Sequence, residues 1–175
     1  MSVFYIRRIR TTVWDSDIPA NDDPMLLGTN GVTNCCKTDK NQLSVWIVNN
    51  NDPDSYETKL VLSTIAGGSE KPSSISYVYI EDSELAAIGV TLKQTPGNTA
   101  ISSKKNLHWD IEDLNMEKIS KIGLLIQKKV YDNNQIHKKG AGKIKEYVRA
   151  VFPDGTPEAE DIKSVAGWCN IYNTK

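Results

Sequence analysis

The chain has 175 residues, of which 39% are hydrophobic and 25% are charged, and its formal net charge at pH 7 is −1. This length and composition predict a single globular domain over residues 1–175 that buries a continuous core. The near-neutral balance excludes a histone-like protein and a strongly acidic protein that mimics a partner, but it leaves room for one basic face.

The three cysteines do not indicate a disulfide framework. Their number is odd, and Cys35 and Cys36 are adjacent, so a bridge between them would be strained. Reduced thiols are typical of the cytoplasm, and the sequence shows neither a secretory signal nor an apolar run of membrane-spanning length. We therefore expect a soluble cytoplasmic protein without membrane contact. Because no Cys-x-x-Cys pair is present, we predict no metal site, and no motif indicates a cofactor.

Alternating β-branched and aromatic residues predict strands in the first two-thirds of the chain. The first lies within 3–14, where Arg7, Arg8 and Arg10 interrupt both faces and favour a position that is at an edge of the sheet or partly solvated. Turn-forming residues predict a long connection over 15–42. Further strands are expected over four segments: 43–48, 74–80, 89–93 and 107–111.

The spacing of apolar residues predicts a helix over 53–66, one helical turn at 82–87 and two amphipathic helices between 115 and 151. The apolar stripe of the first amphipathic helix comprises Ile119, Ile122, Ile126 and Val130, and that of the second comprises Ala141, Ile144, Val148 and Val151. A last helix opens at Thr156 and is expected to bury Ile162, Val165 and Cys169.

Together these elements predict an α+β domain with a mostly antiparallel sheet of about five strands in the N-terminal two-thirds. The C-terminal helices are expected to pack on one side of this sheet. Most of the four tryptophans should lie in the core between sheet and helices: Trp14, Trp46, Trp109 and Trp168.

Positive charge is concentrated in residues 116–149, which hold nine Lys or Arg against three acids, whereas the first 115 residues hold ten against fifteen. This surplus predicts a basic helical face that binds nucleic-acid phosphates with little sequence preference. Three arginines near the N-terminus would add to it if the first strand lies alongside. The candidate residues of the face are Lys128, Lys129, His137, Lys138, Lys139, Lys143, Lys145 and Arg149.

A catalytic alternative rests on His108, Asp110 and Glu112. On a strand these three side chains project from one face, where they could hold a divalent metal ion or act as acid and base in hydrolysis. The same alternation arises in any half-buried strand, so we interpret the three residues as the solvated face of one. The sequence therefore favours a non-catalytic protein.

Three functional hypotheses follow, and no catalytic motif stands clearly above background. The first is a binding or accessory protein that acts through a protein partner. The second is a nucleic-acid-binding protein that uses the basic helical face of residues 116–149. The third is a metal-dependent hydrolase that uses His108, Asp110 and Glu112.

Overall fold

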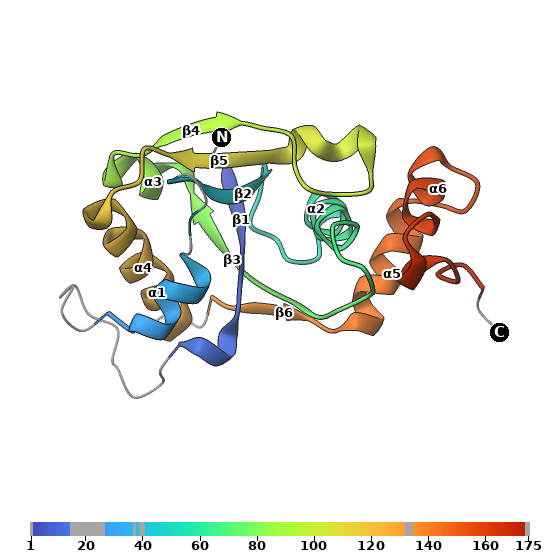
Figure 1. Cartoon of the computed structure of the whole chain (residues 1–175), viewed down its shortest axis with the longest axis horizontal. Coiled ribbons are helices and arrows are strands. Elements are labelled where there is room, and N and C mark those ends of the chain that lie inside the picture. Colours follow the sequence, from blue (N-terminus) through green and yellow to red (C-terminus); the bar gives the residue numbers. More distant parts are fainter. Residues whose placement is uncertain (1, 15–26, 37, 39–40, 132–134, 174–175) are drawn as a thin grey trace.

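A six-stranded antiparallel sheet runs through the centre of the molecule, with helices on both of its faces (Figure 1). The computed structural model describes residues 2–14, 27–36, 38, 41–131 and 135–173. The strand order is β4-β5-β2-β1-β3-β6. The strands are β1 (Phe4–Ile9), β2 (Leu43–Val48), β3 (Ile75–Glu81), β4 (Thr91–Gln94), β5 (His108–Glu112) and β6 (His137–Lys139).

The α+β fold class and the antiparallel sheet are confirmed. The strands are not confined to the N-terminal two-thirds, however, because β6 follows the first basic helix and pairs with β3. A strand of three residues that are all polar, His137 to Lys139, carries no apolar alternation by which it could be recognised.

Of the two positions expected for the first strand, the edge position was wrong, whereas partial solvation agrees with the exposure of Arg8. β1 lies between β2 and β3 rather than at an edge. It pairs with β3 over its whole length, from Phe4 to Ile9, but with β2 only from Phe4 to Ile6. The first arginine, Arg7, therefore follows the last residue of β1 that is paired with β2. The gap between the two strands gives the charged side chains access to solvent although β1 is an inner strand.

Helices cover both faces of the sheet, and each face has its own hydrophobic cluster. In β3, Tyr77 and Tyr79 belong to one cluster, whereas Val78 and Ile80 belong to the other. A strand that is apolar on both faces indicates such a double cover. The first face carries α2 (Tyr56–Ala66), α5 (Ala141–Val151) and α6 (Pro157–Lys163), and the second carries α1 (Thr29–Cys35), α3 (Asp82–Ile88) and α4 (Met116–Tyr131).

The two basic helices, α4 and α5, therefore do not pack on one side as expected. Ile122 and Ile126 of α4 join one cluster, and Ile144 and Val148 of α5 join the other. The chain reaches the outer edge of the sheet at β6 between these helices, so it can continue on the opposite face (Figure 1). None of the described helices is long and apolar enough to cross a membrane.

Two local predictions also need correction. The segment predicted as a long connection contains α1, whose Gly31 packs against Trp14 so closely that a Cβ there would lie 2.4 Å from the indole ring. The last α-helix ends at Lys163, so Cys169 lies beyond it. Cys169 is exposed and not buried as expected, whereas Trp168 is buried. Three of the four tryptophans are buried, as predicted: Trp14, Trp46 and Trp168. The three cysteines are free: Cys35, Cys36 and Cys169.

Candidate nucleic-acid interface

The eight residues predicted to form a basic helical face do not share one surface. Lys128 and Lys129 belong to α4 on one face of the sheet, and Lys143, Lys145 and Arg149 belong to α5 on the other. The remaining three residues, His137, Lys138 and Lys139, form the edge strand β6. The folded chain thus divides the positive surplus among two faces and one edge.

Several of these residues are already engaged within the protein. Arg149 donates a hydrogen bond from Nη1 to the carbonyl oxygen of Ile171 at 3.3 Å. Three of the lysines have a carboxylate partner, with Nζ to oxygen distances of 2.7 Å for Lys129 and Glu84, 2.9 Å for Lys139 and Asp54, and 2.8 Å for Lys143 and Glu146. Phosphate binding by these lysines would compete with their carboxylates.

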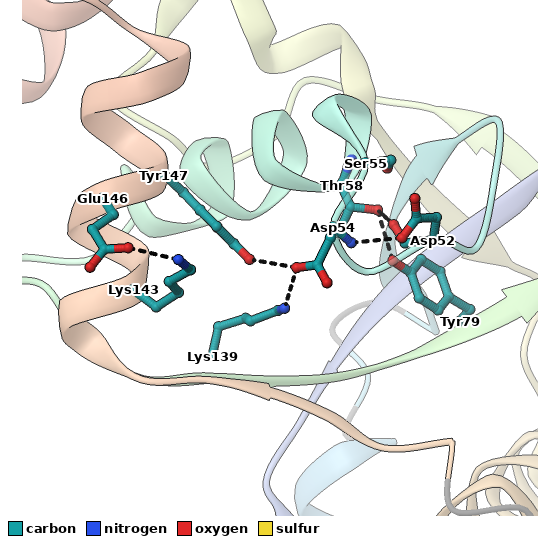
Figure 2. A network of polar contacts seen from close by, with 9 residues as sticks. All are labelled: Asp52, Asp54, Ser55, Thr58, Tyr79, Lys139, Lys143, Glu146 and Tyr147. Atoms are coloured by element: carbon teal, nitrogen blue, oxygen red, sulfur yellow. Dashed lines mark hydrogen bonds and ion pairs between the residues drawn. The ribbon is translucent and has the colours of Figure 1, made fainter.

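Lys139 forms part of a polar network that joins β6 to α5 and to the loop before α2. Asp54, in the loop before α2, accepts hydrogen bonds from Lys139 Nζ at 2.9 Å and from Tyr147 OH of α5 at 3.2 Å (Figure 2). These partners, Lys139 first, hold the pKa of Asp54 below its ordinary value. The ammonium groups of Lys59, Lys139 and Lys143 lie 5.6–5.7 Å from the centre of the Tyr147 ring. The arrangement ties the edge strand to the domain.

His137 is also turned into the protein. Its ring lies 5.2 Å from that of Tyr77 and 5.3 Å from that of Tyr79, measured between centroids. Burial, with a contribution from the charge of Lys139, lowers the pKa of His137 from its ordinary value. The imidazole is therefore mostly neutral at pH 7 and contributes little charge to a phosphate site.

Acidification should destabilise the fold through His137. Because the folded-state pKa is lowered, the unfolded chain binds a proton at higher pH than the folded chain does. Its contribution to stability is therefore present above about pH 6.5, the ordinary histidine value, and is lost as pH falls through the lower folded value. Urea denaturation at a series of pH values should show a shallower decline for His137→Phe, which keeps an aromatic ring in place. An unchanged decline, or a folded-state pKa at or above 6.5 by NMR, would contradict this assignment.

Basic residues without a carboxylate partner among the described residues gather at the open end of β1. A hollow of about 600 Å³, which we call the arginine cleft, is lined there by four basic side chains: Arg7, Arg8, Arg10 and Lys138. Hydroxyl and amide groups complete its polar lining, from Thr11, Thr12, Ser74, Ser76 and Asn34. Among the residues that the structure describes, no aspartate or glutamate lines the cleft.

Strand register brings these residues together from distant parts of the sequence. Ile9 of β1 is paired with Ser76 of β3, which in turn is paired with Lys138 of β6. Paired residues project from the same face of a sheet, so Lys138 and Ser76 share a face with Ile9, whereas Arg8, which is paired with Tyr77, projects from the opposite face at the same end of the sheet. The cleft lining joins the N-terminal arginines to Lys138, around the end of the sheet, and does not include the lysines of the two helices.

Arg7 anchors the cleft. Its guanidinium donates Nη1 to the carbonyl oxygen of Ser44 at 2.6 Å and Nε to that of Cys35 at 3.2 Å, with Nη2 on the same Cys35 oxygen. Burial lowers the pKa of Arg7, but a guanidinium starts so high that it stays protonated at neutral pH. Since both acceptors are uncharged, the positive charge of Arg7 is not cancelled by them.

Arg8, Arg10 and Lys138 are exposed around this anchor. Within the described part of the chain, none of the three forms an ion pair with a carboxylate. The cleft thus combines one partly buried cation with three exposed cations and several neutral hydrogen-bonding side chains. Such a site is suited to oxygen-rich anions.

The proposed catalytic residues belong to β5, which is separated from β1 by β2. His108 and Asp110 do share a face of β5, but they are only 7% and 8% exposed, so our interpretation of them as a solvated face was wrong. Thr95 Oγ1 lies between them, 2.9 Å from His108 Nδ1 and donating to Asp110 Oδ2 at 2.6 Å. Ser44 Oγ also donates to the Asp110 carboxylate, at 3.3 Å.

Glu112 does not join this pair. Its carboxylate accepts from Gln42 Nε2 at 2.9 Å and lies 3.3 Å from Lys93 Nζ. Across the described residues, no three His, Cys, Asp or Glu side chains gather in a group that could hold a metal ion. His108 and Asp110 are instead linked through the Thr95 hydroxyl, and His108 Nε2 lies 3.9 Å from Asp110 Oδ1.

The chain is without a recognisable relative in any of three comparisons: no family model, no curated protein and no solved structure matches it.

Proposed function

We propose that the protein binds the phosphate backbone of nucleic acid in the arginine cleft. The observation that carries this proposal is the meeting of four basic side chains in one hollow whose described lining contains no carboxylate: Arg7, Arg8, Arg10 and Lys138. Arginine presents a planar fork of N–H donors that matches the geometry of phosphate oxygens. Release of counterions from the backbone would add to the affinity.

The spacing of the cations favours a chain of phosphates over a single anion. Arg8 and Arg10 are two residues apart on extended backbone, which corresponds to about 6.6 Å. Lys138 lies two strands away from β1, a lateral distance of about 9.5 Å, and projects from the sheet face opposite to that of Arg8. One phosphate group cannot contact all three, whereas successive phosphates of a polymer can.

The test is the affinity of the full chain for a fluorescently labelled 20-nucleotide single strand, measured by anisotropy at several salt concentrations. Changing Arg8 and Arg10 together to glutamate should weaken binding at least tenfold and reduce the slope of log K against log salt by about 1.4, because about 0.7 of a counterion accompanies each phosphate contact of a single strand. The matched control is Lys118→Glu with Lys145→Glu, which makes the same charge change on α4 and α5.

The control also separates the cleft from the basic helices. Lys145 belongs to the face predicted from the sequence, but it lies outside the cleft lining. If the helix variant loses as much affinity as the cleft variant, overall charge explains the binding and the cleft is not the site. Absence of binding by the wild-type protein at low salt would remove the proposal.

A further inference from the structure

A second hollow adjoins the arginine cleft across β1. It has a volume of about 250 Å³, and Arg7 and Arg8 line both spaces. The divergence of β1 from β2 after Ile6 places this hollow between β1, the end of α2 and the loop that leads into β5. A ligand bound through its phosphates at Arg8 therefore has a concave space beside it.

The lining of this hollow differs from that of the cleft. Trp46 and His108, which are 8% and 7% exposed, line it with the accessible part of two aromatic rings whose centroids are 5.0 Å apart at an angle of 74°. Around them, the lining includes the neutral polar residues Ser44, Ser69 and Asn98. Aromatic surface with a few neutral hydrogen-bonding groups is how proteins hold an unstacked base.

The walls are held in place by contacts that do not involve a ligand. The backbone N–H of Ala100 donates to the carbonyl oxygen of Gly67 at 3.0 Å, and Thr99 Oγ1 donates to the carbonyl oxygen of Thr64 at 2.7 Å. The two walls approach so closely that a Cβ on Gly68 would lie 2.2 Å from the carbonyl oxygen of Asn98. The hollow is thus formed before any ligand binds, which lowers the entropic cost of binding.

We propose that this hollow receives a nucleobase, so that the protein selects single-stranded over double-stranded nucleic acid. The inference rests on the proposed phosphate binding in the cleft. Bases of a duplex are paired and stacked, and a base must be splayed out to enter a walled space. Neutral polar groups and stacking surfaces favour a strand that carries bases over an abasic strand, and they give little preference among base sequences.

The test compares three 20-nucleotide ligands by anisotropy: a single strand, the duplex that contains it, and the same single strand with abasic sites throughout its centre. The wild-type protein should bind the single strand about tenfold more tightly than the abasic strand, which is the size expected for stacking of a base. Ser69→Leu, which fills the hollow from one wall, should remove this difference without changing affinity for the duplex.

A matched control and a second variant keep the test independent of folding. Ser120→Leu makes the same change on α4, outside both hollows, and should behave as wild type. If Ser69→Leu does not fold by circular dichroism, Asn98→Leu fills the hollow from the exposed opposite wall. Single-strand binding should also quench tryptophan fluorescence, and Trp46→Phe should remove most of that quenching.

The outcomes separate this inference from the function on which it rests. Equal affinity for the normal and abasic strands, with a loss of both on changing Arg8 and Arg10, would overturn the base site and leave phosphate binding standing. Tight binding of a free mononucleotide that displaces the strand would identify a nucleotide site instead. If no ligand binds at low salt, both proposals fail.

Discussion

Changing Lys129 to alanine is expected to lower the free energy of unfolding by about 2–3 kcal/mol, toward the lower end of the cost of breaking a buried ion pair because its partner is partly exposed. Lys129 Nζ lies 2.7 Å from Glu84 Oε1, and the two side chains are 9% and 30% exposed. The other oxygen of Glu84 accepts the backbone N–H of Glu81 at 2.7 Å and caps α3. Without Lys129, this carboxylate remains partly buried and loses its cation.

Lys121 offers a matched control on the same helix. Its Nζ is also 2.7 Å from a carboxylate oxygen, that of Glu117, but these side chains are 49% and 71% exposed. Solvent screening limits such a pair to about 0.5 kcal/mol or less, so Lys121→Ala should change stability little. Urea denaturation of both variants measures the difference. Equal losses would contradict the argument that burial, and not distance, decides the strength of the pair.

The same variant tests the sequence-based assignment of Lys129 to nucleic-acid binding. If the arginine cleft is the site, Lys129→Ala should bind a labelled strand as the wild type does, at a temperature where both are folded. A large loss of affinity would instead favour the face of α4 and argue against the cleft.

Changing Arg7 to methionine should cost about 2–4 kcal/mol, since hydrogen bonds that involve a charged donor contribute about 1.5–3 kcal/mol each. The guanidinium satisfies the carbonyl oxygens of Ser44 and Cys35, which belong to β2 and to the end of α1. At this point β1 and β2 no longer pair, so the side chain replaces part of the missing ladder. Methionine retains much of the side-chain volume but leaves both oxygens without their donor.

Arg7→Lys distinguishes geometry from charge. A lysine keeps the positive charge, but its compact ammonium group cannot reproduce the forked contact with two separate carbonyls. We expect a loss of at least about 1 kcal/mol, relative to a change below about 0.5 kcal/mol for the exposed neighbour in Arg8→Met. Denaturant unfolding provides both values. A fully stable Arg7→Lys protein would show that charge alone accounts for the role of Arg7.

Strongly patterned segments were predicted from the sequence because their own residues carry the signal. The strands over 43–48 and 74–80 and the amphipathic helices α4 and α5 appear close to their expected bounds. Alternation and helical spacing reflect burial on one face of each element, and they are visible without knowledge of what covers that face. By contrast, α1 has no such spacing, and it is held by contacts such as that of Gly31 with Trp14.

The sequence predicted several residues of the candidate site, but it did not predict how they are arranged. Positive charge, the N-terminal arginines and Lys138 were all visible, yet charge was assigned to helices because it is most concentrated there in sequence. Which lysines are available to bind a ligand depends on their carboxylate partners. Asp54 is 85 residues from Lys139 in the chain, and Glu84 is 45 residues from Lys129. That the protein acts through a protein partner stays a prediction.

Sequence by itself determined the fold class, most of the strands and helices, the absence of disulfides among the three cysteines and the presence of a basic segment. Only the tertiary structure decided that α4 and α5 lie on opposite faces of the sheet, that Lys129 is buried and that Arg7, Arg8 and Arg10 meet Lys138 in one cleft. The physical reason is that periodicity is a local property of the chain, whereas strand order and side-chain pairing depend on contacts between residues far apart in sequence.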